Sequence, residues 1–237
     1  SLRITAVRGS IPSLILLPWR SWHAWMAVRR QQSPQKTGLE SGRSLISAAR
    51  PKKRNIRGIV ITHGHLDHIG AIPYLLPKLN FPPVYGLPLT ISLVKKRIEE
   101  FHQEKQVRLH VIKPTDRLAL GASFECEFFR VNHSIPDGMG IILKTPVGTC
   151  VHTGDFKFDY TPVFQQPADY AKISELGTRD VLALFSDSTN ALKPGSTPSE
   201  KKIAETLENI IRDAPGRIII ASFASLIDRI QQIITLA

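Results

Sequence analysis

The chain has 237 residues, of which 42% are hydrophobic and 22% are charged, which is ordinary globular composition with enough apolar residues for one sizeable core. Its formal net charge is +11. Residues 1–57 carry all of this excess, because they hold 12 lysines and arginines and a single acid, Glu40, while the remaining 180 residues hold 19 basic and 19 acidic groups. The bulk charge therefore does not indicate that the rest of the chain binds nucleic acid.

The sequence argues against a disulfide-stabilised secreted protein and against a membrane-spanning protein. The two cysteines, Cys126 and Cys150, form neither a disulfide framework nor a metal-binding pair, so we expect buried free thiols and a reducing cytoplasm. No apolar run reaches the ~20 residues of a membrane span, so no membrane partner is expected. The apolar stretch 11–19 is short and contains Pro18, which argues against a signal peptide.

Residues 1–57 differ in character from the rest of the chain. All three tryptophans lie here, aspartate is absent, and no period of two or 3.6 residues persists. We predict an aberrant basic segment over 1–57, poorly packed over 7–52.

Regular patterns begin at Gly58. The β-branched run 58–62 predicts a buried strand, and 71–79 predicts a short helix or turn. Leucines and other apolar residues at helical spacing predict a helix within 88–105. Strand patterns follow at 108–113, 123–131 and 139–155, the last folded into a hairpin around Pro146 and Gly148.

The last quarter of the chain alternates strand and helix patterns. Residues 181–187 and 217–222 predict strands, and 225–237 predicts a helix. Thr197 and Glu200 form a capping box with Pro198 at the first helical position, which predicts a helix that ends before Gly216. This alternation predicts parallel pairing with right-handed crossovers.

The most informative motif is HGHLDH, which follows the strand predicted over 58–62. It places four ligand-type side chains within six residues: His63, His65, Asp67 and His68. In a tight loop, His63 and His65 can converge on one metal ion while the other two turn toward a second. Imidazole and carboxylate ligands suit Zn²⁺ or Mn²⁺, and the lack of cysteine argues against a closed structural zinc site.

Two more candidate ligands follow predicted strands downstream. His133 lies in VNHSIPDG and Asp155 in VHTGDFKFD. A carboxylate has two oxygens, so Asp155 can bridge two metal ions ~3.5–4 Å apart. His152 is a competing candidate, but its alternation with Val151 favours packing in a strand. His23, His102 and His110 have no partner pattern and are expected at the surface.

These motifs resemble the metallo-β-lactamase superfamily. The strings THGHLDHIGAIPYLL, VNHSIPDGMGIILKTPVGTCVHTGDFKFD and SDSTNALKPGSTPSEKKIAETLENI are similar to the ribonuclease J family of β-CASP nucleases, over residues 54–237. The resemblance implies an α/β fold: an incomplete metallo-β-lactamase αββα sandwich over 58–187, followed by the start of a β-CASP domain over 188–237.

The resemblance also implies the site. His63, His65 and His133 bind one divalent ion, Asp67 and His68 bind a second, and Asp155 bridges them. Asp67 orients the attacking hydroxide, and Asp187 is the β-CASP acid that supports the site. The implied activity is exonucleolytic and endonucleolytic hydrolysis of RNA with two metal ions, zinc or else manganese, in a cytoplasmic homo-oligomer.

The chain departs from the family in two places, each of which leads to an expectation. Residues 7–52 lack the glycine-rich strands and acidic motif of the family, which suggests a compensated frameshift or an assembly error. The family's later histidines have no counterpart before Ala237, and Asp228 stands where relatives commonly carry histidine. We therefore expect a fragment that cleaves RNA slowly or not at all. The alternatives are a degenerate fragment that binds RNA or a partner without turnover, and a small-ester or thioester hydrolase of the same fold.

Overall fold

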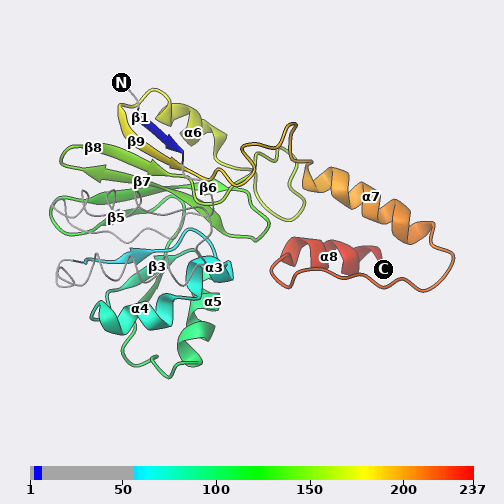
Figure 1. The fold of residues 1–237 in the computed structure, drawn as a ribbon, viewed down its shortest axis with the longest axis horizontal. Coiled ribbons are helices and arrows are strands. Elements are labelled where there is room, and N and C mark those ends of the chain that lie inside the picture. The colour runs from blue at the N-terminus through cyan, green and yellow to red at the C-terminus, as the bar shows by residue number, and fades with distance from the viewer. Residues whose placement is uncertain (1–2, 7–55) are drawn as a thin grey trace. The chain divides into compact units, whose positions relative to one another are not determined.

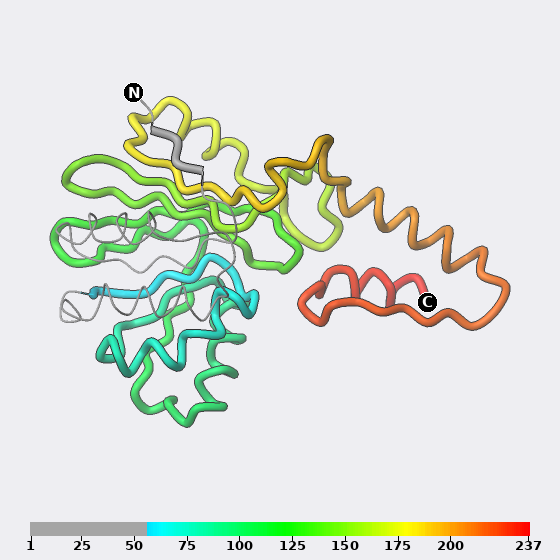
Figure 2. Tube along the Cα trace, in the orientation of Figure 1, coloured from blue at the N-terminus to red at the C-terminus, as the bar shows by residue number. Residues whose placement is uncertain are grey.

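The computed structural model describes residues 3–6 and 56–237, which Figures 1 and 2 trace through the chain. These residues belong to two compact units. The smaller unit contains 56–113 and 118–124, and the larger unit contains 3–6, 114–117 and 125–237. The prediction that 7–52 is poorly packed falls outside the described residues.

The smaller unit is built on a parallel three-stranded sheet of order β2-β3-β4. Its strands are β2 (Ile59–Val60), β3 (Val84–Gly86) and β4 (Leu109–Val111), and its helices are α3 (Leu66–Ile69), α4 (Ile72–Lys78) and α5 (Pro88–Glu99). The core joins the buried sheet residue Ile59 to Leu76 of α4 and Val94 of α5. The strand and both helices predicted here are confirmed.

The helix predicted within 88–105 ends earlier than its pattern suggested. α5 stops at Glu99, and residues 101–106 form turns. His102 has a backbone φ of 54°, in the left-handed region that a helix cannot accommodate. Glu100, Glu104 and Lys105, which follow the end of the helix, are exposed.

The larger unit contains a sheet of order β1-β9-β8-β7-β6-β5. Its strands are β1 (Arg3–Ala6), β5 (Arg117–Ala119, of which only the first residue belongs to this unit), β6 (Glu125–Val131), β7 (Gly138–Thr145), β8 (Gly148–His152) and β9 (Val181–Ser186). The predicted hairpin is confirmed, with Thr145 paired to Gly148. Helix α6 (Tyr170–Leu176), which the sequence patterns did not predict, packs Leu176 into a core with Phe129 and Ile142.

Strand directions bring three chain segments to one edge of this sheet. β6 and β8 are each antiparallel to β7, and β8 is parallel to β9. The carboxyl ends of β6, β8 and β9 therefore point the same way. The residues that follow these strands are the predicted site residues His133, Asp155 and Asp187.

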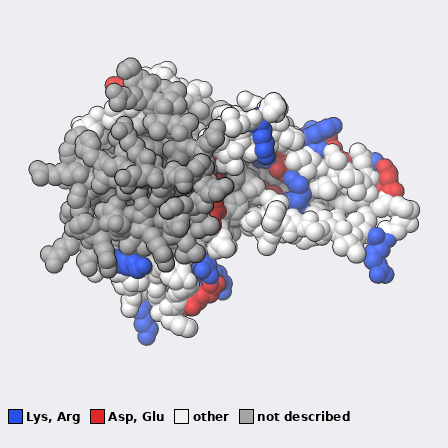
Figure 3. All heavy atoms as spheres, in the orientation of Figure 1, with Lys and Arg blue, Asp and Glu red and all other residues white. Residues whose placement is uncertain are grey.

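The chain ends in two helices, α7 (Glu200–Arg212) and α8 (Ile227–Leu236). Basic and acidic side chains are mixed over this region in Figure 3, in agreement with the balanced charge of the chain beyond residue 57. The mixed α/β class predicted from the sequence is confirmed. The proposed boundaries 1–57, 58–187 and 188–237 stay a prediction.

Two predictions for this region are wrong. Residues 217–222 form no strand, and Ile219 is 91% exposed. β-Branched residues favour a strand only where a neighbouring strand can pair with them and cover their side chains. The N-cap of α7 is Ser199, whose hydroxyl accepts from the Lys202 amide at 3.3 Å, and not Thr197. The carboxylate of Asp159 accepts from the Glu200 amide at 2.9 Å, so a distant residue helps to set this helix start.

Candidate metal centre

His63 and His65 lie on the segment that leaves β2. Residues 59–62 are fully buried, and His63 is 1% exposed, so the buried strand fixes the position of its imidazole. Nε2 of His63 lies 3.1 Å from Nδ1 of His65, and the two rings meet edge to face. On the other side of the ring, Nδ1 of His63 lies 3.1 Å from the hydroxyl of the buried Thr62. Such a contact fixes ring orientation in metal-binding histidines.

The short helix α3 places Asp67 and His68. His65 is its N-cap, and its carbonyl accepts from the His68 and Ile69 amides. A side chain at Gly70 would place its Cβ 2.6 Å from the Leu66 carbonyl, so this tight turn requires glycine. The His68 ring lies 4.0 Å from that of His63, measured between centroids. The side chain of Asp67 is 56% exposed, with Oδ2 3.5 Å from Nε2 of His68.

In the larger unit, His133 and Asp155 approach each other from the ends of β6 and β8. Nε2 of His133 lies 4.0 Å from Oδ2 of Asp155, and their side chains are 21% and 12% exposed. Gly154, which precedes Asp155, has a φ of 64°, a left-handed conformation that glycine adopts without strain. This turn redirects the chain at the end of β8.

Asn132 holds these two segments together, although the sequence analysis did not single it out. It is 1% exposed. Its amide donates to the Gln166 carbonyl and accepts from the Ala168 amide, both at 2.9 Å. Its backbone carbonyl accepts from the Lys157 amide at 2.8 Å. The only sequence signal was its place before His133, because its partners lie more than 20 residues away.

Asp187 is placed at the same sheet edge by the end of β9. Its backbone amide donates to the Thr153 hydroxyl at 3.1 Å, two residues before Asp155. Its carboxylate accepts from the amide and the hydroxyl of Thr189, at 2.9 and 2.7 Å. Asp187 therefore orders the segment that follows β9 and connects it to the Asp155 turn.

The remaining candidates behave as packing or surface residues. His152 is 3% exposed; its Nδ1 accepts from the Gly154 amide at 3.0 Å, and its ring stacks near Phe185. His102 and His110 are exposed. Cys126 and Cys150 are free and buried, and burial raises their thiol pKa values to about 12 and about 11.

A second charged cluster lies in the larger unit, centred on Glu127. Its side chain is 2% exposed, and four basic side chains approach it: Lys144 at 2.5 Å, Arg179 at 3.3 Å, Lys172 at 3.4 Å and Arg117 at 3.9 Å. The hydrogen bond from Lys144 lowers the pKa of the Glu127 carboxyl to about 2, against a desolvation that would raise it. This cluster contains no metal-ligand pattern and is a structural ion-pair network.

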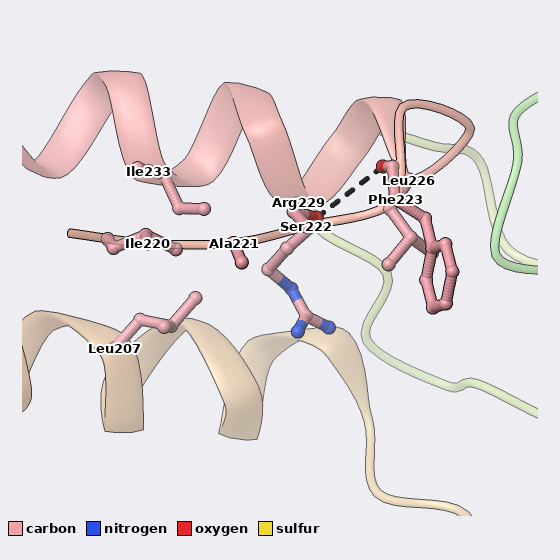
Figure 4. A pocket seen from close by; sticks show the side chains of 8 residues that line it. All are labelled: Leu207, Ile220, Ala221, Ser222, Phe223, Leu226, Arg229 and Ile233. Carbon is pink, nitrogen blue, oxygen red and sulfur yellow. Dashed lines mark hydrogen bonds between the residues drawn. The ribbon is translucent and has the colours of Figure 1, made fainter.

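The C-terminal helices enclose an apolar groove of about 540 Å³. Figure 4 shows Leu207 of α7 and Ile233 of α8 facing it from opposite sides, with Ile220 between them. Arg229 points from α8 toward α7, where its guanidinium donates to Glu200 at 3.0 Å. The groove contains none of the predicted site residues.

The donor set fits a divalent metal ion. Two ligands of a tetrahedral ion with bonds of ~2.0–2.1 Å lie roughly 3.3 Å apart, close to the 3.1 Å between the facing nitrogens of His63 and His65. Two imidazole nitrogens at this separation can share one proton in a hydrogen bond or, when both are unprotonated, can present two lone pairs to one cation. The structure thus groups His63, His65 and His68 in the smaller unit, and His133 with Asp155 in the larger unit.

Among the described residues, no helix is long and apolar enough to cross a lipid bilayer.

Comparisons with known proteins point to one superfamily. Residues 33–221 match the profile of the metallo-beta-lactamase superfamily. Ribonuclease J of Thermus thermophilus is 46% identical over 187 residues, which cover 77% of this chain and 33% of that protein. Ribonuclease J2 of Bacillus subtilis is 42% identical, over 76% of this chain and 31% of that protein. The chain thus spans about a third of the length of these relatives.

A crystal structure of a protein of unknown function from Enterococcus faecalis V583 superposes with a TM-score of 0.53 at 18% identity. The match covers 75% of this chain and 44% of the other, which shows a likeness of fold. Members of this superfamily bind divalent metal ions, and the imidazoles and carboxylates described above are of the kind required. On the match to its profile over most of the sequence, the chain belongs to the metallo-beta-lactamase superfamily.

Proposed function

We propose that this chain provides the metal-binding part of an RNA phosphodiesterase of the ribonuclease J kind. The observation that carries the proposal is the 46% identity to a ribonuclease J across the segment that holds every candidate ligand. The local geometry supports it, because the first two histidines of HGHLDH already have the spacing of two ligands on one ion.

The proposed ligands are divided between two ions. His63, His65 and His133 would hold the first, Asp67 and His68 would hold the second, and Asp155 would contribute to both. We propose zinc, with manganese as the alternative. When bound, the two cations would supply a water of lowered pKa and neutralise charge on the phosphodiester.

The protein residues then have distinct tasks. The exposed carboxylate of Asp67 can accept a hydrogen bond from the attacking water and orient it toward phosphorus. The Thr62 hydroxyl fixes the orientation of the His63 ring. Asp187 is a positioning residue, because its contacts hold Thr153 and Thr189 rather than a substrate.

The wider setting is part of the same proposal. We propose that 188–237 begins a β-CASP domain, that the full-length protein is a homo-oligomer, and that it acts on RNA in the cytoplasm. The buried free thiols of Cys126 and Cys150 are consistent with a reducing compartment.

The test measures bound metal together with RNA cleavage. The purified chain is loaded with Zn²⁺ or Mn²⁺, its metal content is determined, and single-turnover cleavage of a 5′-monophosphorylated RNA is followed. His65→Ala removes a proposed ligand. His102→Asn is the matched control, because His102 is exposed and asparagine tolerates its positive φ.

We expect the unmodified chain and His102→Asn to bind more metal than His65→Ala, and we expect RNA cleavage by these two metal-binding proteins to be slow or absent. Absence of bound metal, with the same background cleavage in all three proteins, would contradict the proposal. Metal-dependent hydrolysis of a thioester without RNA cleavage would contradict the proposed substrate and favour a small-ester hydrolase.

A further inference from the structure

The segment that follows β8, together with the first residue of α6 (Figure 1), carries a cluster of aromatic side chains that the proposed chemistry does not use. We call Phe158, Tyr160 and Tyr170 the aromatic platform. The rings of Tyr160 and Tyr170 are stacked, with centroids 4.9 Å apart and planes 19° apart. Phe158 packs against Tyr170 at 6.0 Å. Tyr160 is 75% exposed and Phe158 is 53% exposed, so one face of the stack is open to solvent.

The backbone on both sides of Tyr160 is held in place. Asp159 has a fully buried side chain, which accepts from the Thr161 amide at 3.0 Å and from the Glu200 amide at 2.9 Å. Lys157, two residues earlier, pairs with Glu200 at 2.6 Å. An exposed aromatic ring on a fixed backbone loses little entropy when a flat ligand stacks on it.

The aromatic platform also lies close in the chain to the proposed ligands. Tyr160 follows Asp155 by five residues, a separation of at most about 18 Å. The bridge between Lys157 and Asn132 ties the same segment to the residue before His133. A strand bound at Asp155 can therefore extend over the platform.

We propose that the aromatic platform stacks an unpaired nucleobase of single-stranded RNA, an inference that rests on the proposed function. Stacking on exposed aromatic rings is the usual way in which proteins bind single-stranded bases without sequence preference. Charge does not provide the attraction here: residues 156–170 hold two acids and one lysine, and that lysine is already paired. A duplex, whose bases are stacked on each other, is a poor ligand for this surface.

The test measures RNA affinity in the presence of a chelator, so that binding is separated from cleavage. The probes are a short oligoadenylate, its abasic counterpart with the same phosphates, and a duplex of the same length. The variants are Tyr160→Ala, Tyr160→Phe and the control Tyr74→Ala. Tyr74 lies on α4, is 52% exposed, and contacts the ring of Phe101 edge to face.

We expect Tyr160→Ala to weaken oligoadenylate binding about 5- to 150-fold, while Tyr160→Phe and Tyr74→Ala bind as the unmodified chain does. The abasic strand should bind the unmodified chain and Tyr160→Ala equally. The inference is overturned if Tyr160→Ala keeps full affinity, if it weakens the abasic strand as much, or if the unmodified chain does not bind oligoadenylate. The metal and cleavage measurements with His65→Ala judge the proposed function separately.

Discussion

Replacement of Glu127 by glutamine removes one charge from the centre of four basic side chains and keeps the shape of the side chain. The folded state lowers the pKa of this carboxyl from 4.5 to about 2, a difference of about 2.5, which corresponds to about 3 kcal/mol of folding free energy at neutral pH. Because the folded pKa is the lower one, this contribution is complete well above pH 4.5. It declines as the pH falls through 4.5 and is lost below about 2. Roughly 1 kcal/mol of it remains at pH 3.

The assay is urea denaturation followed by circular dichroism, at pH 7 and at pH 3. The control is Glu125→Gln, because Glu125 also pairs with Lys144, at 2.8 Å, but its side chain is 39% exposed. We expect Glu127→Gln to lose about 3 kcal/mol at pH 7 and less than half of that at pH 3, and the control to lose less than 1 kcal/mol. Equal losses for the two variants at pH 7, or a loss for Glu127→Gln that does not change with pH, would refute the reasoning.

Three further substitutions or treatments test other parts of the fold. Asn132→Ala leaves the buried Ala168 amide and the part-buried Gln166 carbonyl without their side-chain partner and should lower the free energy of unfolding by about 1–3 kcal/mol in the same assay; a loss below about 0.5 kcal/mol would contradict its role. Ser199→Ala should cost about 1 kcal/mol through loss of the α7 cap, whereas Thr197→Ala should cost almost nothing, and the reverse order would restore the cap predicted from the sequence. At pH 8, Cys126 and Cys150 should resist iodoacetamide in the folded protein and react on unfolding, because burial raises their pKa values; rapid alkylation without urea would contradict their burial.

The sequence was sufficient to single out the candidate ligands, whose assignment to metal ions stays a prediction. His63 and His65 are separated by one residue after a buried strand, so local geometry alone brings their nitrogens together. The approach of His133 to Asp155 required more, because it depends on β6 and β8 pointing the same way on either side of β7. The hairpin between β7 and β8 could be recognised from its turn residues, which made that direction predictable.

Features that depend on distant partners could not be predicted. The sequence around Glu127 does not show which basic side chains will surround it. They are Lys144 of β7, Lys172 of α6 and Arg179. The start of α7 was placed two residues early because Asp159, 41 residues away, accepts from the first helical amide. Residues 217–222 have the composition of a strand, but composition does not provide the neighbouring strand that pairing requires.

The isoleucines at 218–220 affect how the protein behaves in concentrated solution. They present three consecutive β-branched side chains, 38%, 91% and 42% exposed, on a segment that is outside every strand of the described chain. Such a segment can act as a template for pairing with the same segment of another molecule. Aggregation of the protein should therefore increase with its concentration. The substitution Ile219→Lys would act as a gatekeeper against this aggregation and would leave the HGHLDH motif unchanged.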